Sequence, residues 1–254
     1  MHRKKFRTSV LITSMVILFS SCNKDNGDPS STNGKTTAVF NSSVTYGALT
    51  DQDGNKYKTV TIGMQTWMAE NLRTTKYNDS TSIPNVTGAS AWSTLTTGAY
   101  CNYNHTTFTD TIATNGRLYN WFAVNSGKLA PKGWHVATDA EWTTLTTYLG
   151  GREAAGDKLK EVGASHWKRF APSRGGSPAN DTVATNSTGF TALPSGGHNI
   201  DGTFSFIGTS GVWWTATEED AIYAYNREMT SSSGTVFWAG YDKRMGFSVR
   251  CVKD

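Results

Sequence analysis

From Gly211 onward the chain alternates short apolar runs with turn residues, as β-strands do. Val, Trp, Tyr and Phe dominate these runs, and Gly, Ser and Asp lie between them. The same character appears on both sides of Gly63. Because β-branched and aromatic runs bounded by turn residues are typical of strands, we predict strands over residues 56–63, 65–71, 212–217, 221–228, 235–240 and 246–252.

A helical spacing of apolar residues appears in the middle of the chain. Trp142, Leu145 and Leu149 lie on one face of a helix, and the Gly-Gly pair that follows them would end it. Shorter helical segments are predicted over residues 116–127 and 156–163. Helices and strands together predict a mixed α+β protein.

The stretch that opens this helix, GWHVATDAEWTTL, holds His135, Asp139 and Glu141 within seven residues. An imidazole and two carboxylates at this spacing could form a metal site or an acid–base pair. However, Thr138 and Glu141 fit the S/T-x-x-E capping box, and Asp139 favours the positive end of the helix dipole. The stretch is therefore interpreted as a helix start. His135 is expected to make a hydrogen bond in the core.

Residues 1–21 have the pattern of a secretory signal peptide. Four Lys and Arg residues precede an apolar run of about ten residues, which is too short to span a membrane. The run ends in LFSSC, which resembles the lipobox of bacterial lipoproteins. This resemblance implies cleavage before Cys22 and acylation of its thiol, which would anchor the protein to a membrane. An ordinary signal peptide cut near Ser20 or Ser21 is the alternative.

The signal segment also accounts for the net charge of +4. Of the 24 Lys and Arg residues, four lie in it, which leaves 20 cations against 20 Asp and Glu. No basic run remains to form a nucleic-acid surface, so no nucleic-acid partner is expected. Residues 22–43 are polar and poor in apolar side chains, as flexible tethers are. Residues 44–254 are expected to form one large domain.

Two cysteines remain beyond Cys22, and exported proteins meet an oxidising environment. Cys101 and Cys251 are therefore expected to form a disulfide. Two unpaired buried thiols are the alternative.

Strong catalytic motifs are absent from the sequence. There is no nucleophile elbow, zinc-protease motif, phosphate-binding loop or dinucleotide fingerprint. Glu218 and Asp220 could serve a glycoside hydrolase, but adjacent acids at a strand end are typical of a solvated turn. Ser195 and His198 lie in a Gly-rich segment predicted to be a loop, with no acid to orient them. We expect no catalytic residue, no metal site and no cofactor.

The aromatic content, 12% of the chain, is more informative. Trp and Tyr rings stack on the C–H faces of sugars while neighbouring polar groups bond hydroxyls. Trp213 and Trp214 are adjacent, so in a strand one should face inward and the other outward. Trp213, Trp214, Trp238 and Tyr241 are the candidate ligand-binding residues, with core packing as the alternative for each.

Several segments together resemble a known family. They include DGNKYKTVTIGMQTWMAENLRTTKYND, GRLYNWFAV, APKGWHVATDAEWTTL, GVWWTATEED and GFSVRCVKD. In this order they are similar to the Fibrobacter succinogenes major paralogous domain, over about residues 44–254. The resemblance implies exported, often lipid-anchored bacterial proteins and carries no established activity.

A more distant resemblance is to the C-type-lectin-like fold, which formylglycine-generating enzymes share. It implies a small twisted antiparallel sheet, two main helices and long loops. It also implies that a disulfide between Cys101 and Cys251 could tie the last strand to the body. The calcium-lectin and oxidase motifs are absent, so those functions do not carry over.

The expected function is that of a non-catalytic binding module on an outer-membrane lipoprotein, facing the periplasm or the cell surface. Glycan is the favoured ligand. A protein partner in adhesion or in an envelope complex is the alternative, and a hydrolase that uses Glu218 or Asp220 is a weaker one.

Overall fold

The computed structural model describes residue 28 and residues 30–168 and 184–254. The predicted signal peptide and Cys22 lie outside these ranges. Within them, no helix has both the length and the apolar character needed to cross a membrane. The elements, in chain order, are β1 (Gly47–Thr50), β2 (Lys56–Ile62), β3 (Gln65–Met68), α1 (Ala89–Ser93), β4 (Tyr100–Cys101), the 3-10 turn η1 (Tyr103–His105), α2 (Thr109–Asn115), β5 (Leu118–Tyr119), α3 (Trp121–Val124), β6 (Trp134–Val136), α4 (Asp139–Tyr148), α5 (Arg152–Leu159), β7 (Ser195–His198), β8 (Phe204–Ile207), β9 (Ser210–Glu218), β10 (Tyr223–Thr230), β11 (Val236–Asp242) and β12 (Cys251–Lys253).

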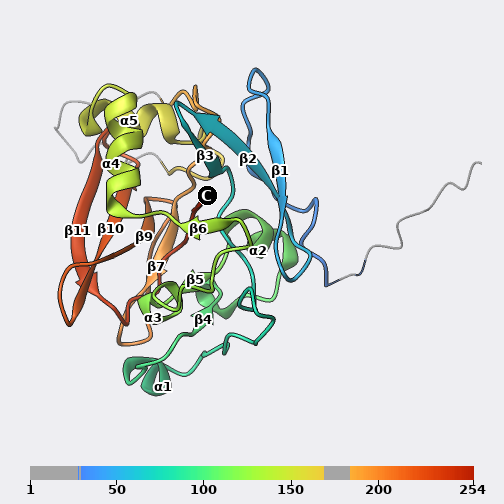
Figure 1. The fold of residues 1–254 in the computed structure, drawn as a ribbon, viewed down its shortest axis with the longest axis vertical. Helices are drawn as coiled ribbons and strands as arrows, with labels where there is room; N and C mark the ends of the chain where they lie inside the picture. Colours follow the sequence, from blue (N-terminus) through green and yellow to red (C-terminus); the bar gives the residue numbers. More distant parts are fainter. Residues whose placement is uncertain (1–27, 29, 169–183) are drawn as a thin grey trace, which may run out of the picture.

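Two five-stranded sheets dominate this α+β fold (Figure 1). The first has the order β1-β2-β3-β12-β6 and is antiparallel throughout. The second has the order β11-β10-β9-β7-β8, with one parallel pairing between β7 and β9. The expectation of one small sheet is therefore corrected to two five-stranded sheets and the two-stranded sheet β4-β5, because the C-terminal strand β12 joins the N-terminal hairpin and not the β9–β11 strands.

The predicted helix is confirmed as α4. Trp142, Leu145 and Leu149 are buried as the spacing predicts. The Trp142 ring packs against Trp67 from the first sheet, at 4.9 Å between centroids, and Trp213 from the second, at 6.1 Å. This helix thus closes an aromatic core between the two sheets.

The start of α4 has the expected capping box. Thr138 Oγ1 accepts from the Glu141 N–H at 3.2 Å, and Glu141 Oε2 accepts from the Thr138 N–H at 2.8 Å. The local sequence alone is sufficient to specify these contacts.

We expect Thr138→Ala to lower the free energy of unfolding by about 1 kcal/mol, because the Glu141 N–H loses its acceptor. Urea denaturation of the variant and the wild type measures the difference. Thr144→Ala, on the exposed face of the same helix, is the control. Equal midpoints for Thr138→Ala and Thr144→Ala would contradict this role for the cap.

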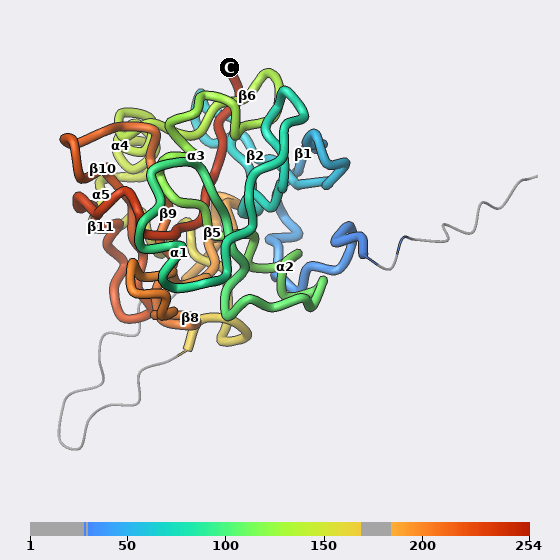
Figure 2. Tube along the Cα trace, turned by 90° about the horizontal axis from the view of Figure 1, so that it is seen from below, coloured from blue at the N-terminus to red at the C-terminus, as the bar shows by residue number. Residues whose placement is uncertain are grey.

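Part of the segment predicted to be a flexible tether, residues 22–43, is packed on the domain. Residues 30–43 lie against the domain and run beside α2 (Figure 2). The Thr37 N–H donates to Thr114 Oγ1 at 2.9 Å, and the Val39 N–H donates to Glu161 Oε1 at 2.6 Å. The prediction is therefore wrong for this part, because its backbone and polar side chains bond to segments that are distant in sequence.

Two local predictions are corrected. The apolar run over 116–127 forms β5 and the single-turn helix α3 rather than one helix. Residues 195–198, predicted to be a loop, form strand β7, which pairs with β8 and with Gly211 at the start of β9. Gly196 and Gly197 fit there because a Cβ on either would lie within 3 Å of neighbouring atoms.

Candidate functional site

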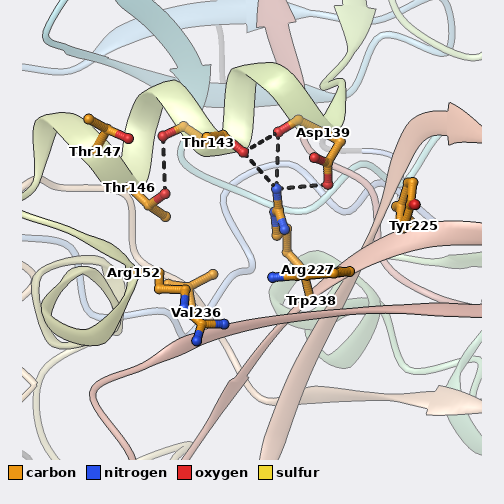
Figure 3. A pocket seen from close by; sticks show the side chains of 9 residues that line it. All are labelled: Asp139, Thr143, Thr146, Thr147, Arg152, Tyr225, Arg227, Val236 and Trp238. Atoms are coloured by element: carbon orange, nitrogen blue, oxygen red, sulfur yellow. Dashed lines mark hydrogen bonds and ion pairs between the residues drawn. The ribbon is translucent and has the colours of Figure 1, made fainter.

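A cavity of about 420 Å³ opens between α4 and the β10–β11 hairpin. We call it the groove. Figure 3 shows threonines and Asp139 along α4 facing Arg227 and Trp238 on the strands. The lining residues are Asp139, Thr143, Thr146, Thr147, Arg152, Tyr225, Arg227, Val236 and Trp238.

The strand register explains why an arginine and a tryptophan share the groove. Arg227 of β10 lies directly opposite Trp238 of β11, and opposed residues project from the same face of a sheet. Tyr225, two residues from Arg227, is on that face too. Its ring meets the Trp238 ring edge-to-face at 5.9 Å between centroids. Trp238 is 53% exposed, so the structure presents its ring to solvent.

Arg227 fixes the position of α4 over the sheet. Its Nη2 lies 2.7 Å from Asp139 Oδ1 and donates to Asp139 O and Thr143 Oγ1, both at 3.0 Å. The Arg227 residue is only 5% exposed. Burial lowers the pKa of Arg227, and Asp139 opposes that shift. The Asp139–Arg227 pair, in which the arginine is buried and the aspartate partly exposed, therefore forms the polar floor of the groove.

A close backbone contact positions the far wall, α5. The Gly156 N–H donates to Gly234 O at 2.8 Å, and a Cβ at Gly156 would lie 2.6 Å from that oxygen. Only glycine allows this approach. It brings the start of α5, with Arg152, to the edge of the groove.

Of the four predicted ligand-binding residues, only Trp238 lines the groove. Trp213 and Trp214 are both fully buried, so the expectation that one faces outward is wrong. The reason is that the second sheet is covered on both faces. Trp213 packs under α4 and Trp214 against Phe247.

Tyr241 lies on the opposite face of β11 from Trp238, because the two are three residues apart. Its ring packs edge-to-face on Phe247, at 5.4 Å between centroids. The predicted aromatic quartet is therefore not one site.

The expected disulfide is absent. Cys101 and Cys251 are both free and buried. Cys101 lies in β4 and Cys251 in β12, which belong to different sheets and different apolar clusters. Burial raises the pKa of both thiols well above its usual range. The prediction of a disulfide is corrected to the alternative of two unpaired buried thiols.

The acids considered for hydrolysis have structural contacts. Glu218 pairs with Lys243, and Asp220 Oδ1 accepts from the N–H groups of Ile222 and Tyr223 at 2.7 and 2.8 Å. Ser195 Oγ accepts from Asn71 at 3.1 Å. These groups fix turns and strands. No group of three or more His, Cys, Asp or Glu in the described ranges could hold a metal ion.

Of the three suspect residues at the helix start, the structure brings His135 and Glu141 together and directs Asp139 elsewhere. His135 bonds Glu141 Oε1 at 2.6 Å and Asp254 Oδ1 at 2.7 Å. Its side chain is half-exposed, so the expectation of a core position is wrong. Burial by itself lowers the pKa of His135, but the hydrogen bonds to Asp254 and Glu141 outweigh it, so the pKa is raised. Asp139 instead faces Arg227 in the groove.

Sequence reasoning missed most of the groove. Asp139, Thr143, Thr146 and Thr147 form a polar stripe at helical spacing, beside the apolar stripe of α4. That spacing was a usable signal. Arg152, Tyr225 and Arg227 carried no local signal, because the pairing of β10 with β11 and the contact of α5 bring them together.

These features define an α+β protein that presents an aromatic ring beside an arginine–aspartate ion pair in a polar groove. The model of the Fibrobacter succinogenes major domain matches residues 60–253. The chain therefore belongs to this family, as its sequence segments predict. No curated protein and no solved structure matches it significantly.

Proposed function

We propose that this protein is a non-catalytic glycan-binding module, with the groove as its binding site. The observation that carries the proposal is the half-exposed Trp238 ring, held by Tyr225 beside donors and acceptors of α4. A sugar ring stacks on such a surface, while threonine hydroxyls bond its hydroxyls. The groove volume of about 420 Å³ suits one or two sugar rings.

The test is a glycan array followed by calorimetry of the best ligand. We expect Trp238→Ala to weaken its Kd at least tenfold, about 1.4 kcal/mol, because the stacking surface is removed. Phe108→Ala is the matched control, since Phe108 is an exposed aromatic residue outside the groove lining. Equal affinity for the two variants would contradict the assignment of the groove.

A protein partner is the second candidate, and a different surface supports it. Phe237 and Tyr241 are exposed aromatic side chains on the face of β11 that points away from the groove. Aromatic residues of this kind are enriched in protein interfaces. A flat glycan array together with a specific pull-down that Phe237→Ser abolishes would favour this function.

Location in the outer membrane, through a lipid on Cys22, is part of the proposal. It rests on the basic start, the short apolar run and the LFSSC sequence. Mass spectrometry of the mature protein tests it. An unmodified N-terminus at any residue other than Cys22 contradicts it.

The finer fold assignment is also a proposal: a C-type-lectin-like domain with α4 and α5 as its two main helices. Its support is the placement of β12 between β3 and β6, which brings the end of the chain back into the first sheet. An experimental structure with another strand order would contradict it.

A further inference from the structure

The charges around the groove are unequal. Two arginines and one carboxylate line it. Asp139 is already neutralised by Arg227 at 2.7 Å, which leaves the charge of Arg152. The lining therefore carries one net positive charge, at its α5 end.

Arg227 has donor capacity that the protein does not use. All three of its contacts involve Nη2. Its Nε–H is buried and has no hydrogen-bond acceptor in the part of the chain that the structure describes. A buried N–H without an acceptor is costly, so the side chain gains when an acceptor enters the groove.

Arg152 adds a second source of positive potential. It is the first residue of α5, whose N-cap Gly151 provides no side-chain cap. The N–H groups at a helix start carry partial positive charge and favour anions. Glu153 pairs with Arg152 at 2.9 Å, but both side chains are largely exposed, and solvent weakens such pairs.

We propose that the groove is specific for sugars that carry a carboxylate. The ring stacks on Trp238, and the carboxylate lies between Arg152 and Arg227. A single net positive charge matches a single carboxylate, and the planar guanidinium fork matches its two oxygens. Uronic acid residues within a polysaccharide and terminal sialic acids share this chemistry. The inference rests on the proposed glycan-binding function.

The probes are oligomers of galacturonate, glucuronate and mannuronate and a sialylated trisaccharide, each paired with its carboxyl-reduced form. Calorimetry on the full chain measures both members of each pair. We expect at least one acidic member to bind tenfold more tightly than its reduced form. The preferred pair identifies the source, polysaccharide or sialic acid.

Three variants make the test specific to the site. Arg152→Gln should abolish the preference for the acidic member over its reduced form. Glu153→Gln should raise the affinity for the acidic member only, by about threefold, because it removes a carboxylate that competes for Arg152. Arg244→Gln removes a similarly paired arginine outside the groove and should change neither affinity.

The outcomes separate the two proposals. Binding of reduced sugars that depends on Trp238, without preference for acidic ones, overturns the carboxylate inference and keeps the glycan function. A preference that survives Arg152→Gln also overturns the inference. Absence of binding to every probe and to the glycan array overturns both.

Discussion

Arg250→Met is expected to lower the free energy of unfolding by about 4 kcal/mol. Arg250 is 1% exposed. Its guanidinium donates four hydrogen bonds, and none goes to a carboxylate. The acceptors are Asn71 Oδ1 at 2.7 Å, Met68 O at 2.8 Å, Phe190 O at 2.9 Å and Thr191 O at 3.0 Å.

Burying an arginine whose hydrogen bonds, within the described ranges, go to neutral acceptors is costly in itself. Burial lowers the pKa of Arg250 to about 9, which still leaves it charged at neutral pH. Replacing Arg250 is nevertheless more costly than keeping it buried, because methionine leaves three buried backbone carbonyls without their hydrogen-bond donor. Those carbonyls belong to β3 and to the segment before β7, so Arg250 connects the two halves of the molecule.

Urea denaturation at pH 7 measures the effect. Arg244→Met is the control, since Arg244 makes a partly exposed pair with Asp242 and surface pairs contribute about 1 kcal/mol or less. The loss of unfolding free energy in Arg250→Lys should fall between the losses in these two variants. The lysine ammonium group retains the positive charge, but it cannot reach all four acceptors. If Arg250→Met and Arg244→Met unfold at the same urea concentration, Arg250 does not have the stabilising role assigned to it.

Acidification from pH 7 to pH 4 is expected to remove about 3 kcal/mol of stability through His198 alone. His198 lies in β7 and is 1% exposed. Its ring packs on Trp92 at 4.3 Å and on Phe204 at 4.6 Å between centroids. Its Nδ1 has no hydrogen-bond partner within the described ranges.

The direction follows from the protonation equilibria. Burial, with a smaller effect of His105, lowers the pKa of His198 from 6.5 to about 4, and Asp201 opposes the shift. Between these two values the unfolded chain binds a proton that the folded chain does not. Stability therefore falls as the pH falls from 6.5 to about 4, and this contribution is fully present above 6.5.

His198→Phe isolates this effect from the other titrating groups. Phenylalanine keeps an aromatic ring between Trp92 and Phe204 but binds no proton. Urea midpoints at pH 7, 6, 5 and 4 should show a steeper loss for the wild type than for the variant. His135, whose pKa is raised, contributes in the opposite direction in both proteins and cancels in the difference. Parallel curves would contradict the prediction.

The sequence determined the features that depend on neighbouring residues. Thr138 and Glu141 specify the start of α4, because both partners lie within one helical turn. The spacing of Trp142, Leu145 and Leu149 specifies its buried face, and the runs around Gly63 specify the β2–β3 hairpin. The segments that resemble the family are likewise local, so the family assignment followed from them.

Only the tertiary structure decided which residues meet across the chain. Trp213 and Trp214 could not be recognised as core, because the elements that cover each face of their sheet come from elsewhere in the sequence. The free state of Cys101 and Cys251 depends on two sheets that no local pattern places. The groove depends on the register of Arg227 with Trp238 and on the Gly156–Gly234 contact. Such pairings are set by the packing of the whole chain, and for this reason the sequence predicted the helix but not the site beside it.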